Sequence, residues 1–262
     1  MLKYIIYSLL VVVFSLAIET PANAQTGESF IKIAEAFKRR SLLDSAVYFY
    51  KKASLEFHSK NQIPDYVNAK NQIGIILTRQ DKYTEAKEHL YQALNQSASL
   101  PDSNDMLIAT IYLGLGVIYG AEMDFDKSLS YHFKALKIRR KKLGENHTDV
   151  ATSYGNIGNV YLRKKDLDLA LENHNAAKKI RQKLFGEKSE ELSQSYFHLG
   201  NVYKEKKEYN SALNSYQKSL ANKIVLYDEK HKDVIRLYKT MSEVYYLKGD
   251  KTNGDLFKKK SE

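Results

Sequence analysis

The chain has 262 residues, in which lysine and arginine outnumber aspartate and glutamate by 41 to 31, giving a net charge of +10. It contains no cysteine, which excludes a disulfide framework, a thiolate nucleophile and a zinc–thiolate site. The moderate positive charge favours acidic partners or anionic surfaces without choosing among them.

Residues 1–24 have the pattern of a secretory signal peptide. Lys3 supplies a positive start, residues 5–18 are almost unbroken apolar, and Ala22-Asn23-Ala24 is a small-x-small cleavage motif. The apolar run is shorter than the roughly 20 residues that span a bilayer, which disfavours a retained membrane anchor. The sequence therefore predicts export to the periplasm, cell surface or medium, with a mature chain of residues 25–262.

From Ser29 onward the hydrophobic pattern is helical, with apolar residues three or four apart and no alternating run typical of a strand. Pro64 and Pro101 are expected to lie between helices, where a missing N–H is tolerated.

The helical pattern repeats along the chain. A small residue recurs with gaps of 40, 42, 42, 42 and 42 residues, at Ala34, Gly74, Gly116, Gly158, Gly200 and Ser242. A second small position follows in each repeat, at Ala46, Ala86, Ser128, Ala170, Ala212 and Gly254. Small residues let two helices approach closely, so the pattern predicts stacked helix pairs.

Turn residues separate the expected helices. Short polar turns within the repeats are expected at Asp81-Lys82, Asp124, Lys165-Asp166, Lys207-Glu208 and Gly249-Asp250. Longer linkers join the repeats, where Gly144 and Gly186 suit a left-handed residue after a helix end. Thr148 or Asp149, and Ser189, suit the next N-caps, while His147 and His231 are interpreted as solvated turn residues.

This arrangement of small and aromatic positions resembles the tetratricopeptide repeat family, over residues 27–262. The 42-residue period, longer than the usual ~34, resembles the repeats of kinesin light chains. The resemblance implies an all-α solenoid: a right-handed superhelix of antiparallel helix pairs whose first helices line a concave groove. The expected units are residues 27–66, 67–108, 109–150, 151–192, 193–234 and a truncated cap, 235–262.

No catalytic motif is present in the sequence. It has no G-x-S-x-G, H-E-x-x-H or P-loop, and the glycines at 114, 116 and 120 miss the dinucleotide fingerprint by one residue. His132 and His174 occupy equivalent repeat positions, and helix packing explains them better than a metal site, which would need a third ligand. We therefore expect no catalytic residue, no metal and no cofactor, although a hydrolase or enzyme accessory remains an alternative.

Candidate binding residues lie on the expected groove wall: Asn156, Asn159, Arg163, His198, Asn201, Lys204 and Arg236. Amides on such a wall can pair with the backbone of an extended peptide, but these residues could also be merely solvated. A family clamp for peptide carboxylates matches poorly, because Gly155 and Thr240 stand where the resemblance requires lysine and arginine.

A second candidate surface is a basic ladder near the ends of the second helices: Lys137, Arg139, Lys141, Lys179, Arg181, Lys183 and Lys223. Positive charge at a helix C-terminus interacts favourably with the helix dipole, and this effect alone can explain the ladder. The alternative is an anionic partner, either an acidic peptide or lipid headgroups of the cell envelope.

These features favour a non-enzymatic, exported scaffold of bacterial type that binds a peptide or protein segment in its concave groove. One alternative is a free-standing sensor module that acts with a membrane histidine kinase, and another is an envelope adaptor that uses the basic ladder. Self-association is possible, and nucleic acid is not expected as a partner because no recognition module is present.

Overall fold

The computed structural model describes residues 26–101 and 105–262, and its regular structure over these ranges is entirely helical. The predicted signal peptide, residues 1–24, lies outside the described part. The described residues form α2 (Gly27–Arg39), α3 (Leu43–Ser59), α4 (Ile63–Arg79), α5 (Tyr83–Ser97), α6 (Asp105–Ala121), α7 (Phe125–Leu143), α8 (Thr148–Lys164), α9 (Leu167–Phe185), α10 (Glu190–Glu205), α11 (Tyr209–Leu226), α12 (Lys232–Lys248) and α13 (Lys251–Lys260). The all-α prediction is confirmed.

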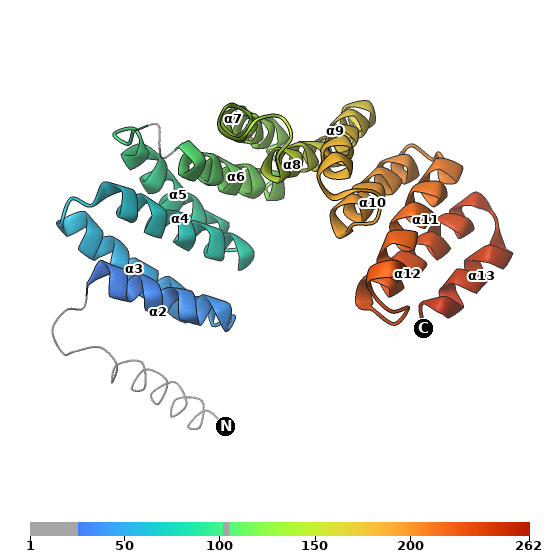
Figure 1. Ribbon diagram of the computed structural model, residues 1–262, viewed down its shortest axis with the longest axis horizontal. Helices are drawn as coiled ribbons and strands as arrows, with labels where there is room; N and C mark the ends of the chain where they lie inside the picture. The colour runs from blue at the N-terminus through green and yellow to red at the C-terminus, as the bar shows by residue number, and fades with distance from the viewer. Residues whose placement is uncertain (1–25, 102–104) are drawn as a thin grey trace, which may run out of the picture. The chain divides into compact units, whose positions relative to one another are not determined.

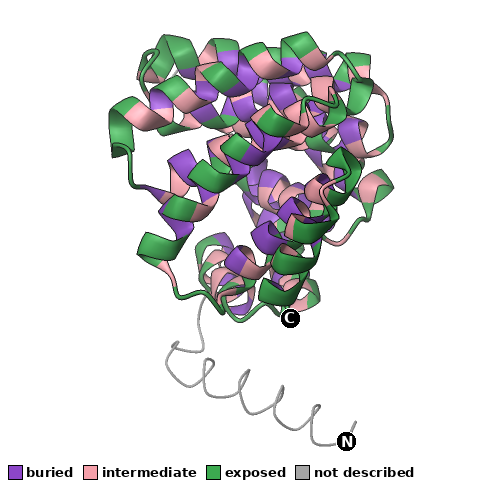
Figure 2. Ribbon diagram, turned by 90° about the vertical axis from the view of Figure 1, so that its right-hand side faces the viewer, coloured by how far each residue is buried: buried purple, intermediate pink, exposed green. Residues whose placement is uncertain are grey.

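Within each of two units, helices pack mainly on the helices next to them in sequence. The chain divides into two compact units between Ile118 and Tyr119, inside α6. In the first unit α2 packs on α3, α3 on α4 and α4 on α5, and in the second the contacts run from α7 on α8 to α12 on α13 (Figure 1). Figure 2 shows the buried residues on the faces where neighbouring helices meet. Packing of this kind, confined to neighbours, is characteristic of a solenoid.

The short turns within the helix pairs share one backbone conformation. A residue with a φ of 58° to 68° precedes the second helix at Asp81, Met123, Lys165 and Lys207, and the glycine at 249 has a φ of 85°. The following residue donates its N–H to the carbonyl five residues earlier, at 2.9–3.0 Å. This is the Schellman motif that ends many helices. The predicted turn positions are therefore confirmed.

The linkers between repeats account for the 42-residue period. α7 and α9 have 19 residues each, and Gly144 and Gly186 follow them with φ of 79° and 75°. Their ψ values, 171° and −172°, differ from the left-handed helical conformation that the sequence suggested. This extended, positive-φ region is open essentially only to glycine. Between α3 and α4 the linker is only residues 60–62, so the first period is shorter.

The N-caps after the linkers differ partly from the prediction. Ser189 caps α10 as expected, accepting an N–H through its hydroxyl at 3.2 Å. α8 is capped by His147, whose Nδ1 accepts the N–H of Asp149 at 3.1 Å, so neither Thr148 nor Asp149 is the cap. His231 caps α12 in the same way at 3.3 Å. These histidines organise helix starts, which a purely solvated role would not do.

The small position of a first helix is filled by a side chain of its second helix. A Cβ added at Gly158 would lie 2.8 Å from the His174 ring, and one added at Gly200 would lie 2.5 Å from the Tyr216 ring. Glycine is therefore required for the close approach at these two positions, as the repeat pattern indicated.

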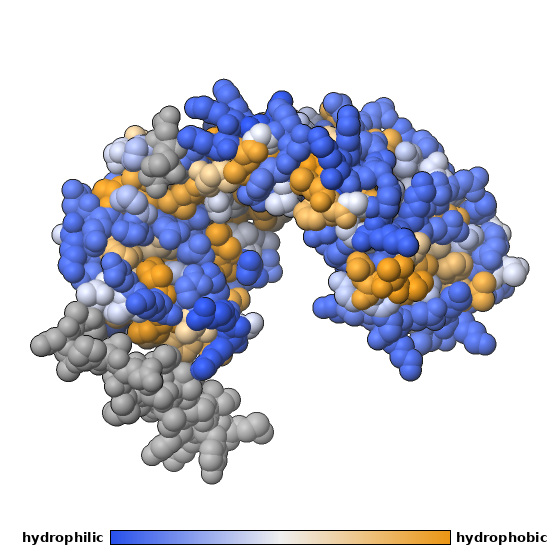
Figure 3. Space-filling view, in the orientation of Figure 1, coloured by the Kyte–Doolittle hydropathy of each residue, from blue (hydrophilic) through white to orange (hydrophobic). Residues whose placement is uncertain are grey.

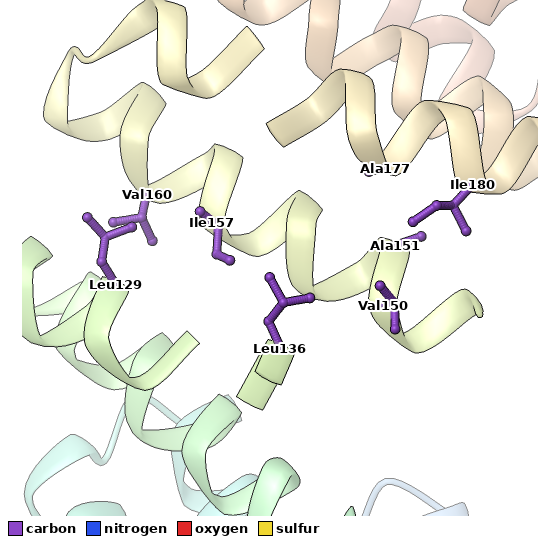
Figure 4. Packing of buried hydrophobic residues seen from close by; sticks show 8 residues of the cluster. All are labelled: Leu129, Leu136, Val150, Ala151, Ile157, Val160, Ala177 and Ile180. Atoms are coloured by element: carbon purple, nitrogen blue, oxygen red, sulfur yellow. The ribbon is translucent and has the colours of Figure 1, made fainter. Parts of the chain in front are cut away.

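Apolar side chains from three successive helices close the core between pairs. Figure 4 shows one such cluster, made by Leu129 and Leu136 of α7, Val150, Ala151, Ile157 and Val160 of α8, and Ala177 and Ile180 of α9. All eight are at most 8% exposed, so the contact between pairs is dry and packed.

Two details concern helix ends. Pro64 lies in the first turn of α4, not between helices as predicted, at a position where its missing N–H leaves no helical hydrogen bond unmade. α13 has ten residues, which confirms the short final helix.

Candidate functional site

The predicted groove residues lie on three first helices of the second unit. α8 carries Asn156, Asn159 and Arg163, α10 carries His198, Asn201 and Lys204, and α12 carries Arg236. Spacings of three or four residues place the members on one helix along one side. Arg163 and Arg236 are exposed and the other five are half-buried, and α8 contacts α10 directly. We call these seven residues the first-helix wall.

Side chains of α10 and α12 meet at the first-helix wall. The guanidinium of Arg236 lies 5.1 Å from the centre of the Phe197 ring and 3.6 Å from the Asp233 carboxylate. The ammonium of Lys204 lies 3.8 Å from the Glu243 carboxylate. Exposed contacts of these kinds contribute about 1 kcal/mol or less each, so both cations are positioned but remain open to a ligand.

Asn201 is partly committed to the fold. Its side-chain oxygen accepts the hydroxyl hydrogen of Tyr216, a buried residue of α11, at 2.7 Å. The amide nitrogen of Asn201 keeps its two N–H donors. Asn201 therefore both anchors the second helix and offers donors at the wall.

His198 forms a buried pair with His174 of α9. The two rings stack with centroids 5.2 Å apart and planes within 4°. Burial, reinforced by Arg181 and Arg236, lowers the pKa of His198 to about 4. Burial, reinforced by His198 and Arg181, lowers the pKa of His174 to about 3. Both imidazoles are neutral near pH 7, so His198 brings no positive charge to the wall.

His132 packs inside the second unit, in agreement with its interpretation as a packing residue. Its side chain is 2% exposed, and burial, with the nearby charge of Arg139, lowers its pKa to about 4. Across residues 26–101 and 105–262, no three histidine, aspartate or glutamate side chains gather closely enough to hold a metal ion.

Two arginines of the basic ladder are structural. Arg139 is 7% exposed and donates to the carbonyl oxygen of Asp149 at 2.9 Å and the hydroxyl of Ser153 at 3.1 Å. Arg181, half-buried, repeats the contact one module later, donating to the hydroxyl of Ser195 at 3.0 Å. The prediction that Arg139 forms part of a basic surface is wrong, because the side chain turns inward to join its helix to the next pair.

Lys223, the corresponding residue one repeat later, is also buried. It is 2% exposed, and its ammonium lies 2.7 Å from the Glu190 carboxylate and 3.6 Å from that of Asp233. It therefore links α11 to α10 and α12, and its assignment to an open surface is wrong. Of the ladder, Lys137, Lys141, Lys179 and Lys183 are exposed.

In the part of the chain that the structure describes, no helix is both long enough and apolar enough to cross a bilayer.

The stack of helix pairs, each closed by the same turn, defines an α-solenoid protein. The tetratricopeptide repeat family matches residues 65–141, 107–172 and 149–224, in steps of 42 residues, and together these matches cover more than half of the chain. The chain belongs to the tetratricopeptide repeat family. Such repeats form protein-interaction scaffolds, and members of the family are generally non-catalytic.

Solved structures share the fold at low sequence identity. BtubC (BKLC) from P. vanneervenii superposes with a TM-score of 0.69 at 19% identity, covering 92% of this chain and 90% of that one. A putative kinesin light chain from Podosopora anserina has a TM-score of 0.65 at 15% identity, covering 76% and 94%. The apo form of RapI has a TM-score of 0.65 at 16% identity, covering 90% and 73%. No curated protein sequence matches the chain.

Proposed function

We propose that this chain is a non-enzymatic scaffold whose first-helix wall binds an extended segment of a partner protein. The observation that carries the proposal is the row of amides and cations on α8, α10 and α12, in which each helix presents its polar side chains on one side. Tetratricopeptide arrays are interaction scaffolds, and here the first helices hold the polar groups suited to binding.

The wall can bind a peptide backbone together with acidic side chains. The side chains of Asn156 and Asn159 offer both donors and acceptors, which match the carbonyl and N–H groups of an extended chain. Lys204 and Arg236 add charged donors that favour a carboxylate. The neutral His198 adds one donor and one acceptor. A carboxyl-terminal clamp is not required, because the backbone contacts can form anywhere along a segment.

The binding proposal is tested with two matched pairs of asparagines. Asn156→Ala/Asn159→Ala removes two wall amides, whereas Asn210→Ala/Asn214→Ala removes two exposed amides from the second helix α11. Affinity purification from the native cell envelope should recover a partner with the parent chain and the control variant but not with the wall variant. Equal recovery with both variants would contradict binding at the wall.

We also propose that the chain is exported and that its leader is removed after Ala24. The support is the charged start, apolar run and small-x-small motif of residues 1–24. Amino-terminal sequencing of the protein purified from its natural host should begin at Gln25. A protein that still begins at Met1 would contradict cleavage, and its recovery only from the cytoplasm would contradict export.

A further inference from the structure

Two hollows lie next to each other along the second helices α7 and α9, within the second unit. The first, of about 380 Å³, is bordered by Phe133, Leu136, Lys137, Arg140, Lys141 and Glu145. The second, of about 720 Å³, lies between α9 and the α7–α8 linker, with Tyr154, Ala176 and Ile180 as its apolar part and Lys179 and Lys183 beside them. Glu145 borders both hollows, so the two are neighbours on the surface. We call them the paired hollows.

The paired hollows carry uncompensated positive charge. Among the described residues, none of the exposed lysines 137, 141, 179 and 183 forms an ion pair. The charge of Glu145 is already balanced, because Arg140 Nε donates to both of its carboxylate oxygens, at 2.7 and 2.9 Å. Elsewhere the chain does pair exposed lysines, as with Lys164 and Asp126 at 2.8 Å. Each of the two hollows is therefore bordered by two lysines without an ion pair.

The hollows also offer an apolar surface to a ligand. The Phe133 side chain, which borders the first hollow, is 44% exposed. The side chains of Leu136 and Ile180 are 5% and 8% exposed and close the inner ends of the hollows. An apolar side chain that enters here removes water from both surfaces, which favours binding.

The lysine spacing fits an extended acidic chain. Lys137 and Lys141 are four residues apart on one helix, as are Lys179 and Lys183, which places each pair about 6 Å apart. Alternate side chains of an extended strand are also separated by about 6.6 Å. Two carboxylates at i and i+2 of a strand can therefore meet one pair of lysines at the same time.

We propose that the paired hollows bind an acidic segment of a partner protein, with its carboxylates on the four lysines and an apolar side chain against Tyr154 and Ile180. A protein segment is favoured over an anionic bilayer because Ile180 is only 8% exposed and Tyr154 is half-buried, so a side chain that enters the hollow contacts more of them than a planar surface would. This surface lies on second helices and is separate from the first-helix wall, so it would give the scaffold a second docking face.

The test uses a fluorescein-labelled 12-residue peptide that holds one leucine in a run of aspartate and glutamate, measured by fluorescence anisotropy at low salt. We expect saturable binding that weakens by about tenfold in Lys179→Ala/Lys183→Ala, since each exposed ion pair contributes up to about 1 kcal/mol. Ala176→Glu, which puts a negative charge into the second hollow, should weaken binding at least as much. Lys251→Ala/Lys259→Ala removes two exposed charges from α13 and should leave binding unchanged.

Three further measurements separate the possible outcomes. A peptide with serine in place of leucine should bind several-fold more weakly, whereas equal binding would overturn the apolar contact. Loss of binding in Lys204→Ala/Arg236→Ala, but not in Lys179→Ala/Lys183→Ala, would place the peptide on the first-helix wall and overturn this proposal while supporting the other. If the protein sediments with phosphatidylglycerol vesicles but does not bind the peptide, the hollows face a membrane and the proposal is overturned. The proposal is also overturned if the protein binds neither the peptide nor the vesicles.

Discussion

His174 of α9 and His198 of α10 stack with their ring centroids 5.2 Å apart and their planes within 4°. The same His174 ring fills the space that Gly158 leaves on α8. One side chain thus packs within its own helix pair and against the next pair. Because both imidazoles are buried and neutral, this junction should be sensitive to acid.

The first prediction concerns the pH dependence of stability. The pKa values of His174 and His198 are about 3 and 4 in the fold, against an ordinary value of 6.5. Below pH 6.5 the unfolded chain takes up protons that the folded chain does not, so the free energy of unfolding falls as the pH drops toward 4. The melting temperature, followed by circular dichroism, should therefore be lower at pH 5 than at pH 7.5.

The variant His174→Phe isolates the contribution of this histidine. A six-membered ring fits the position, because Tyr216 occupies the equivalent place beside Gly200. The difference in melting temperature between pH 7.5 and pH 5 should shrink by a few degrees in this variant. For a chain of this size, each kcal/mol of unfolding free energy shifts the melting temperature by about 2–4 °C. An unchanged difference would show that His174 is not protonated on unfolding in this range.

Arg139 should be required for stability although it belongs to a charged row. Arg139→Ala removes donors to the Asp149 carbonyl and the Ser153 hydroxyl, which lie at 2.9 and 3.1 Å. Loss of partners for buried polar groups costs about 1–3 kcal/mol, so the midpoint of urea unfolding should drop clearly. Lys141→Ala, an exposed change on the same helix, should stay within about 0.5 kcal/mol of the parent. Similar effects of the two changes would contradict the inward role.

Lys223 should behave as a buried ionic link. Lys223→Ala leaves the carboxylates of Glu190 and Asp233 without the ammonium that now lies 2.7 and 3.6 Å from them. Breaking such a pair costs about 3–5 kcal/mol when all partners are buried, and we expect the lower end because the carboxylates remain partly solvated. Denaturant unfolding of Lys223→Ala/Glu190→Gln should show partial recovery, and a loss no larger than that of the exposed Lys239→Ala would refute the link.

Two helical glycines should respond to alanine with opposite signs. A Cβ at Gly200 would lie 2.5 Å from the Tyr216 ring, and such overpacking costs about 1–3 kcal/mol. A Cβ at Gly155 would have the guanidinium of Arg181, 3.8 Å away, as its nearest neighbour outside the helix. Gly155→Ala should therefore gain up to about 1 kcal/mol of helix propensity. The melting temperatures of both variants are compared with that of the parent. A change in the same direction for both would contradict the packing described at Gly200 and Gly155.

The repeat pattern predicted the helices and turns because each depends on local chemistry that recurs every 42 residues. Small residues mark where helices touch, and turn residues mark where they end. The sequence did not predict the cap at His147, because an imidazole is an uncommon N-cap. Pro64 was expected in a linker, but the linker between α3 and α4 is so short that Pro64 falls in the first turn of α4. These errors lie at helix ends, where the boundary depends on a few hydrogen bonds.

The basic ladder was only partly predictable. A helix turns by about 100° per residue, so residues two apart point in nearly opposite directions. This rule places Arg139 on a different face of the helix from Lys137 and Lys141. The partners of Arg139 and Lys223 lie on neighbouring helices, and charge alone does not reveal them. The stacking of His198 on His174 likewise depends on how adjacent pairs pack, whereas placement of the wall residues on first helices follows from the repeat register.

Site-specific photocrosslinking tests the central claim, that the first-helix wall is the docking face for a partner protein. A photoreactive amino acid is placed at Asn156, Asn159 or Arg236 on the wall, or at Asn210 or Asn214 on the second helix α11, and adducts are identified in the native host by mass spectrometry. Binding at the wall predicts one shared protein adduct from the three wall positions and none of it from the two others. An adduct confined to the second-helix positions, or no adduct from any wall position, would contradict the claim.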